Sequence, residues 1–388
     1  MAHSGSGAND GPETPMKPEG ARATVRAVWQ AGVEAVGGEQ SVAAALRTCP
    51  APAPDQIIAV GKAAGAMARA AIDHFQTGCP TLVVTKYGHA ADLPDHVTLI
   101  EAGHPVPDRN SILGGQALKD AVGAMAPDSH LLVLVSGGAS ALAELPRDGL
   151  GLDDLARENR EMLAAGLDIH AMNQRRKTLS QIKGGQLLAG FSGRSVTVLA
   201  ISDVQGDDVG VIGSGIGAVP LGAPLAADIT VVASNRVARD AAMHKAAALG
   251  LPSVENSEVL YGDINDIAAA LAPRLIASAK GISVYGGEPT VVLPDPAGQG
   301  GRNQALALLL AREIQGIEGL TILVGGTDGT DGPTDAAGAV IDGATWGPGA
   351  AEALERADSG TWLDQRGALV RTGPTGTNVM DLLVALRA

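Results

Sequence analysis

Short apolar runs that end in glycine-rich or polar turns recur along this chain, and they constrain its fold more than any other feature. Eight of them occur, at 57–61, 81–85, 97–103, 131–138, 196–203, 228–234, 282–288 and 320–329. Their apolar residues are consecutive rather than alternating, which is typical of strands buried on both faces, as in parallel sheets.

Helical stretches lie between these runs, at 62–75, 111–126, 235–250 and 302–314. Strands that alternate with helices predict doubly wound α/β sheets. Such sheets bind ligands beyond the carboxyl ends of their strands, which is where the glycine-rich turns fall. The 52 glycines of the chain allow its backbone to approach a ligand closely in those turns.

The length of 388 residues and a hydrophobic content of 45% favour two α/β domains. We expect a flexible tail over residues 1–20, an N-terminal domain over 21–250 and a C-terminal domain over 251–388. The boundary is placed where segment 250–266 interrupts the rhythm of strands.

Composition excludes several classes of function. A net charge of −14 and an aromatic content of 2% argue against nucleic acid as a partner, because binding needs cations and stacking platforms. No run approaches the ~18 apolar residues of a membrane span, so no membrane association is expected. Cys49 and Cys79 lack the spacing of a disulfide framework or zinc site. The first twenty residues also lack an apolar leader segment, and a cytoplasmic protein is predicted.

Common nucleotide-binding motifs are absent. Gly61-Lys62 lacks the upstream glycine and the following Ser or Thr of a Walker A loop. The stretch 213–218 fits G-x-G-x-x-A, but Val219-Pro220 follows where a helix should start. The strand at 81–85 is followed by Lys86 rather than by an acid that could bind a ribose 2′-hydroxyl, which disfavours NAD.

Two turns in the first half of the chain suit anionic ligands. Lys62 follows a strand and opens a helix, so its ammonium could neutralise a phosphate or carboxylate. A helix-terminal lysine in solvent is the alternative. Segment 136–140 (SGGAS) could wrap backbone amides round an anion, or form only a tight turn.

A basic segment at 173–185 stands out in this acidic chain. On an expected helix, Arg176, Ser180 and Lys183 share one face. An anion site and a solvated charged helix both remain open.

Carboxylates cluster after two strands. Asp203 and Asp207 follow the strand at 196–203 and are typical Mg²⁺ ligands, although an Asp-rich turn would look the same. The loop at 325–338 holds Asp328, Asp331 and Asp335.

An EF-hand starting at Asp328 is excluded, because its third and fifth positions are Thr330 and Gly332. Asp328 is nearest the strand end and is expected at a Mg²⁺–nucleotide site. Asp331 and Asp335 could instead shape the turn or cap a helix.

The second half of the chain also offers a cation and an amide. Arg302 opens a helix after three nearby glycines, where it could grip a carboxylate or a transferring phosphoryl group in a bidentate manner. Segment 372–381 supplies hydroxyls and Asn378 before an expected last helix, and capping alone could explain it.

Taken together, these stretches resemble the type II glycerate 2-kinase family, whose C-terminal domain is called MOFRL. The resemblance covers about residues 22–385 and rests on nine motifs in order, at 60–68, 102–111, 135–142, 172–187, 201–208, 286–292, 298–304, 325–339 and 372–382. The chain departs from the family pattern at 212–220, Thr178 and Ala305. The first departure bears on nucleotide or substrate detail, and the other two on substrate preference.

The resemblance implies two Rossmann-like doubly wound α/β domains with an active-site cleft between them. It implies ATP- and Mg²⁺-dependent phosphorylation of D-glycerate at its 2-hydroxyl, with the functional lysine at Lys62 and the functional arginine at Arg302. Members have also been labelled hydroxypyruvate reductase, so an NAD(P)H-dependent reductase is the alternative. A kinase for a related hydroxy acid and a non-catalytic metabolite sensor are further readings, and a homodimer is compatible with the sequence.

The resulting hypothesis assigns a role to each candidate residue. The catalytic set is Lys62, Arg302 and Asp203, and Mg²⁺ is expected on Asp203, Asp207 and Asp328. Nucleotide and phosphate contacts are expected from Gly61, Ser136, Gly137, Gly138, Ala139, Ser140, Gly326, Thr327, Asp328 and Asn378. Substrate contacts are expected from Lys62, Arg302, Asn303, Ser136, Arg176 and Lys183.

Overall fold

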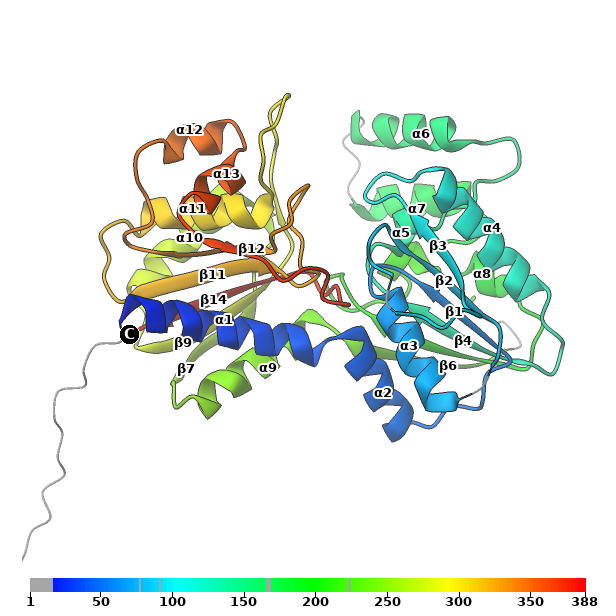
Figure 1. The fold of residues 1–388 in the computed structure, drawn as a ribbon. Coiled ribbons are helices and arrows are strands. Elements are labelled where there is room, and N and C mark those ends of the chain that lie inside the picture. The colour runs from blue at the N-terminus through cyan, green and yellow to red at the C-terminus, as the bar shows by residue number, and fades with distance from the viewer. Residues whose placement is uncertain (1–16, 77, 91, 165–168, 221, 223–224) are drawn as a thin grey trace, which may run out of the picture.

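The computed structural model describes residues 17–76, 78–90, 92–164, 169–220, 222 and 225–388. Two lobes lie side by side, each built round a six-stranded sheet (Figure 1). The expected two-domain α/β architecture is therefore confirmed. Within the described residues, no helix combines the length and the apolar character needed to cross a membrane.

The first lobe holds a fully parallel sheet in the order β3-β2-β1-β4-β5-β6. The strand order reverses between β1 and β4, and α/β sheets bind ligands at such a switch point. The strands are β1 (Gln56–Val60), β2 (Thr81–Lys86), β3 (Thr98–Ala102), β4 (His130–Val135), β5 (Ser195–Ile201) and β6 (Ala226–Ala233).

Helices cover both faces of this sheet, as the continuous apolar runs predict. Leu132 and Leu134 of β4 pack toward α2 (Gly38–Thr48) and α3 (Ala64–Phe75). The intervening Val133 packs on the opposite face. The remaining helices of the lobe are α4 (Arg109–Gly123), α5 (Ala139–Leu142), α6 (Leu152–Ala164), α7 (Ile169–Leu179), α8 (Gln186–Ala189) and the 3-10 turn η1 (Ile212–Gly215).

The second lobe differs from the expected doubly wound domain, because its sheet is mixed and mostly antiparallel. Its order is β13-β12-β11-β14-β9-β7, and among its described strands only β7 and β9 pair in parallel. The strands are β7 (Ser253–Glu258), β9 (Gly281–Gly287), β11 (Leu320–Gly326), β12 (Gly338–Asp342), β13 (Leu369–Val370) and β14 (Asp381–Arg387). Strand β14 occupies the place where a last helix was expected, so that expectation is wrong.

Helices also sandwich this second sheet. Those on one face are α1 (Pro18–Ala35) and α9 (Asn235–Ala248), and those on the other are α10 (Ile264–Ile276) and α11 (Arg302–Glu313). Short elements complete the lobe, namely β8 (Gly262–Asp263), β10 (Pro289–Thr290), α12 (Ala350–Glu355) and α13 (Ser359–Asp364).

The expected boundary at residue 250 separates the strands of the two sheets but not their helices. Helix α1 begins the described chain, yet it packs against β11 and β14 of the second lobe. The next helix, α2, packs on α3 of the first lobe. One continuous apolar core, which includes Val28, Met67 and Val384, therefore runs through both lobes.

Candidate active site

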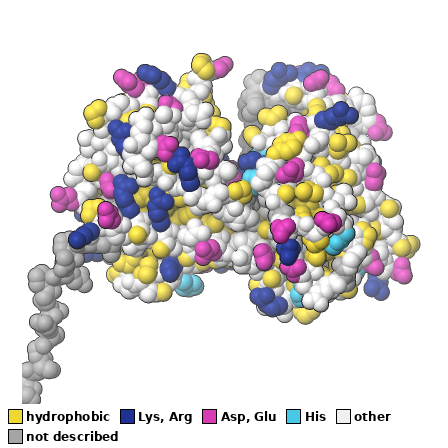
Figure 2. All heavy atoms as spheres, in the orientation of Figure 1, with side chains coloured by type: hydrophobic (Ala, Val, Ile, Leu, Met, Phe, Trp, Pro, Cys, Tyr) yellow, Lys and Arg dark blue, Asp and Glu magenta, His cyan; other side chains and the backbone are white. Residues whose placement is uncertain are grey.

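A cavity of about 1000 Å³ lies between the lobes. Its first-lobe wall includes His104, Gly138 and Asp203, and its second-lobe wall includes Tyr261 and Glu288. Figure 2 shows the indentation that separates the two lobes on one face of the molecule. The turns after β4 and β5 line this cavity, as predicted from the ends of their strands, and the turn after β1 packs against the turn after β4.

The turn after β1 is shaped by the turn after β4. Gly61 has a φ of 126°, and a Cβ there would overlap the Ser136 side chain and carbonyl. The Ser136 hydroxyl is buried and accepts a hydrogen bond from the Ala63 amide at 3.1 Å. The Lys62 amide donates to the Gly137 carbonyl at 2.9 Å. Ser136, predicted to contact ligand, thus serves to hold the backbone of Lys62 in place.

Lys62 reaches across the cleft to the second lobe. Its Nζ lies 2.6 Å from Oδ2 of Asp328, and both side chains are largely buried. The other Asp328 oxygen accepts from the Thr330 amide at 2.9 Å and from its hydroxyl at 3.1 Å. Burial favours the neutral acid, but the Lys62 ammonium and these bonds outweigh it and hold the pKa of Asp328 below its usual value. In this state, Asp328 is the counter-ion of Lys62.

The two glycines of the β4 turn admit polar groups from both lobes. A Cβ on Gly137 would overlap Asp203 and Asn378, so only glycine fits there. The Asn378 amide donates to Oδ2 of Asp203 at 3.2 Å. Gly138, with a φ of 80°, packs between His104 and the Lys62 side chain. The expected Asp203 and Asn378 are thus brought together at the cavity.

Asp203 carries an unfavourable charge. Burial raises its pKa to about 6, and the nearby Glu288 carboxylate adds to this effect, while Lys62 opposes it. A carboxylate in that position would be stabilised by a cation, which is the property expected of a Mg²⁺ ligand.

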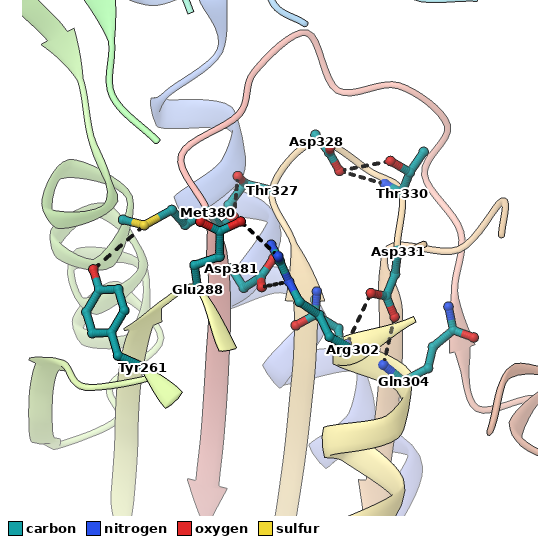
Figure 3. A network of polar contacts seen from close by, with 12 residues as sticks. Tyr261, Glu288, Arg302, Gln304, Thr327, Asp328, Thr330, Asp331, Met380 and Asp381 are labelled. Atoms are coloured by element: carbon teal, nitrogen blue, oxygen red, sulfur yellow. Dashed lines mark hydrogen bonds and ion pairs between the residues drawn. The ribbon is translucent and has the colours of Figure 1, made fainter. Parts of the chain in front are cut away.

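Arg302 is held by two carboxylates of its own lobe (Figure 3). Its Nε donates to Oδ2 of Asp381 at 2.7 Å, and its Nη1 donates to Oε1 of Glu288 at 2.8 Å. Burial lowers the pKa of Arg302, but the two carboxylates outweigh this and raise it above the usual value. Since Glu288 lines the cavity, the guanidinium lies one contact behind the cavity wall.

Asp331 caps the helix that Arg302 begins. Its carboxylate accepts from the backbone amides of Asn303 at 3.1 Å and Gln304 at 2.8 Å, two of the unpaired amides at the start of α11 (Figure 3). Burial nevertheless raises the pKa of Asp331 to about 7. Asn303 itself is buried. Asp335 is exposed and pairs with Arg371 at 3.0 Å.

Thr327 and Gly326 support the site through hydrogen bonds with the neighbouring backbone. The buried Thr327 hydroxyl donates to the Met380 carbonyl at 2.7 Å and accepts from the Val379 amide at 2.9 Å. The Gly326 amide pairs with the Ala337 carbonyl at the end of β11. These bonds fix the segment that carries Asn378 and Asp381, so Thr327 acts on the site through its neighbours.

Arg176 and Lys183 both line the cavity, although not from one helix as predicted. Helix α7 ends at Leu179, and Lys183 lies in the turn that follows. Lys183 forms a buried ion pair with Glu144. Burial lowers the pKa of Lys183 and of Arg176, and Glu144 opposes the shift in both.

The expected magnesium set is only partly assembled. In the described part of the chain, no three His, Cys, Asp or Glu side chains form a group that could hold a metal ion. Asp207 has a left-handed φ of 56° in the turn after β5. Asp203 and Asp328 both lie near Lys62. Because Mg²⁺ commonly takes one or two carboxylates and completes its shell with water and phosphate oxygens, these two still fit such an ion.

Four residues at the site were missed by sequence reasoning: His104, Glu144, Tyr261 and Glu288. His104 lies in the stretch 102–111, so its place in that motif was an available signal. Burial, with Lys62 and Lys86 nearby, lowers its pKa to about 3, which keeps the imidazole neutral. Glu144 and Tyr261 stand in segments with no comparable pattern.

The parallel sheet with its switch point and the polar cavity between the lobes define a two-lobed α/β protein of the ligand-binding kind. Two family models match the chain, a domain of unknown function (DUF4147) over residues 24–246 and the MOFRL family over 281–381. The chain belongs to the type II glycerate 2-kinase family, in which these domains occur together.

Individual relatives agree with this placement. The D-glycerate 2-kinase of Thermotoga maritima is 35% identical, and the match covers 95% of this chain and 99% of the relative. A crystal structure of glycerate kinase from Thermotoga maritima superposes with a TM-score of 0.83 at 32% identity, covering 96% of this chain and 100% of that one. A relative from Agrobacterium vitis, 37% identical over 85% of this chain and 98% of its own, carries a provisional hydroxypyruvate reductase name.

Proposed function

We propose that this protein is a glycerate 2-kinase, which transfers the γ-phosphoryl group of ATP to the 2-hydroxyl of D-glycerate and yields 2-phosphoglycerate and ADP. The observation that carries the proposal is the placement of Lys62 and Arg302 from opposite lobes beside one cavity, each held by carboxylates. The name of the Thermotoga maritima relative points to the same reaction.

Phosphoryl transfer requires positioning and stabilisation of charge more than covalent chemistry from the protein. In this proposal Lys62 neutralises the oxygens of the transferring group directly, and Arg302 adds positive charge from the other lobe, behind Glu288. The turn at Gly137 and Gly138 would offer backbone amides to phosphate oxygens. Because Gly137 has no side chain, Asp203 and Asn378 can lie beside this turn.

Asp203 and Asp328 are the residues that would hold Mg²⁺ on the nucleotide phosphates. When bound, the ion would supply charge neutralisation to those oxygens. If Asp328 held such an ion, it would no longer be the counter-ion of Lys62, and the Lys62 ammonium would be free to contact the phosphoryl group. Asp207 stays a candidate that would need to turn toward the site.

The decisive assay follows ADP release from ATP and D-glycerate with and without Mg²⁺, with the product coupled directly to enolase. Enolase consumes only the 2-phosphate isomer, so one assay tests both the reaction and the position of transfer. We expect ADP and the enolase signal together, both dependent on Mg²⁺. ADP without the enolase signal would point to the 3-hydroxyl or to another acid.

The alternative hypothesis, an NAD(P)H-dependent hydroxypyruvate reductase, gains no support from the first lobe. Its strand β2 ends at Lys86 rather than at an acid that could hold the ribose of the cofactor. Oxidation of NADH by hydroxypyruvate would revive it. Binding of ATP and glycerate without any ADP release would instead favour a metabolite sensor.

The proposal also places the reaction in the cytoplasm. Cys49 and Cys79 are both free thiols, as is usual in a reducing compartment. D-Glycerate and ATP are the expected partners. Light scattering would show whether two copies of the chain form a homodimer.

A further inference from the structure

His104 lines the cavity, yet the phosphoryl-transfer mechanism gives it no role. It stands two positions beyond the end of β3, just as Lys62 and Asp203 stand two positions beyond the ends of β1 and β5. All three strands belong to one parallel sheet. Because such sheets bind ligands beyond the carboxyl ends of their strands, His104 has the same placement in the fold as two residues assigned to the reaction.

The imidazole of His104 lies against the turn after β4. A Cβ on Gly138 would lie 3.1 Å from Cδ2 and 3.2 Å from Nε2 of His104, and 3.2 Å from Cγ of Lys62. The Cδ2–Nε2 edge of the ring and the stem of Lys62 are therefore both next to this glycine. Since the turn and Lys62 are both assigned to phosphate, the ring lies beside the expected position of the phosphoryl group.

The ring nitrogens of His104 are available to a ligand. In the part of the chain that the structure describes, neither nitrogen has a hydrogen-bond partner. Other polar side chains at the cavity differ in this respect, because Asn378 donates to Asp203 and the Tyr261 hydroxyl donates to Glu258. A neutral imidazole has one N–H donor and one acceptor. The donor of His104 can therefore serve a molecule bound in the cavity.

The charge state of the ring suits a donor better than a proton acceptor. Burial lowers the pKa of His104, and the ammonium groups of Lys62 and Lys86 lower it further, against the smaller effect of Asp328. The imidazole is thus neutral at physiological pH and is a weak base. A neutral donor held in place can stabilise charge on a phosphoryl oxygen without any proton transfer.

We propose that His104 is a catalytic residue, which donates a hydrogen bond from its ring N–H to a non-bridging oxygen of the transferring phosphoryl group. This role rests on the proposed kinase function and adds a neutral group to the cations Lys62 and Arg302. His104 keeps its proton throughout, so it takes no part in the bonds that form and break. A donor placed for the geometry of the transition state contributes to kcat more than to the binding of ATP.

The test compares three replacements of His104 in the full chain. H104N and H104Q keep an amide N–H that can donate, whereas H104L fills similar space without a polar atom. ADP release from ATP and D-glycerate gives kcat, calorimetry gives the Kd for ATP, and circular dichroism checks the fold. H96L is the matched control, because His96 is exposed in the segment just before the same strand, β3.

We expect H104L to lower kcat about a hundredfold, as the loss of one donor to a transition state does. The Kd for ATP should change by less than about threefold, because the contact is made chiefly in the transition state. At least one amide variant should regain about tenfold of the lost turnover, since its N–H can replace that of the imidazole. H96L should behave as wild type.

Two results would overturn the role of His104 alone, both with an active wild type. One is wild-type turnover in H104L, and the other is turnover in both amide variants no higher than in H104L, because the ring would then only fill space. Failure of the kinase proposal is distinguishable, because the wild type itself would release no ADP, and the role of His104 would fall with it.

Discussion

Lys62 and Arg302 are both paired cations beside one cavity, but their partners come from different places. The carboxylates that hold Arg302 belong to its own lobe, at Glu288 and Asp381. The carboxylate that holds Lys62 lies across the cleft, at Asp328. Arg302 is therefore oriented whether or not the lobes meet, whereas the surroundings of Lys62 depend on how closely they approach.

This difference suggests that Arg302 is oriented before the cleft closes, whereas the position of Lys62 depends on closure. Groups oriented in advance stabilise a transition state without reorganisation. A group whose partner lies on the other lobe instead links the chemistry to closure of the cleft. The predictions below test this contrast, beginning with the largest expected effect.

Removal of either cation should abolish most turnover. We expect R302A and K62A each to lower kcat by about 10³-fold or more, because neither leaves a cation at that position. Steady-state ADP release measures the effect, and circular dichroism checks the fold. The control is R312A, an exposed position on the same helix that pairs with Glu313. Near-native activity in either variant would remove that residue from the mechanism.

Loss of the interlobe pair should affect both rate and shape. We expect D328N to lower kcat by about a hundredfold, since it removes the carboxylate that positions Lys62. Small-angle scattering should show a larger radius of gyration for ligand-free D328N than for wild type. Wild type should become more compact with ATP and D-glycerate, and no compaction would count against gating. D335N is a control, because Asp335 forms only an exposed pair.

Loss of one carboxylate that holds Arg302 should lower kcat less than the substitutions above. In D381N the guanidinium keeps its bond to Glu288, so we expect kcat to fall by about tenfold with little change in KM. The double variant D381N/E288Q should fall further than either single one. Equal rates for D381N and wild type would mean that Asp381 supports only the sheet.

The smallest expected effect is on the pH dependence of folding stability, and it concerns Asp331, which caps α11. The pKa of Asp331 is raised to about 7, above the ~3.9 of an unfolded chain. The folded state thus binds this proton more tightly, and its stabilising effect is lost as pH rises from about 4 to 7. Urea unfolding across that range should show a steeper decline for wild type than for D331N. Parallel curves would contradict the assignment.

The first lobe was predictable because helices on both faces of a parallel sheet leave an unmistakable run of apolar residues. The second lobe shows the limit of that signal. Ile322 and Val324 face α11 while Leu323 faces α1, so β11 is equally apolar along its length. Strand direction depends on which segments pair, and an antiparallel sheet covered on both faces gives the same pattern.

The candidate site was predictable where a residue stands two positions beyond the end of a strand, as Lys62, Asp203 and Asp328 do. It was not predictable where a polar side chain serves the scaffold. The hydroxyls of Ser136 and Thr327 form hydrogen bonds with backbone groups of other turns. Glu144 gains its place only because the fold brings it to Lys183, 39 residues later.

The packing of α1 on the second sheet has a consequence for the order in which the lobes can form. The sheet receives one of its covering helices, α1, from the start of the described chain and its central strand, β14, last in chain order. During synthesis, α1 must therefore wait with an apolar face exposed until β14 has left the ribosome, long after the strands of the first lobe. We therefore expect the first lobe to fold first. The second lobe, which needs β14, then completes the cleft.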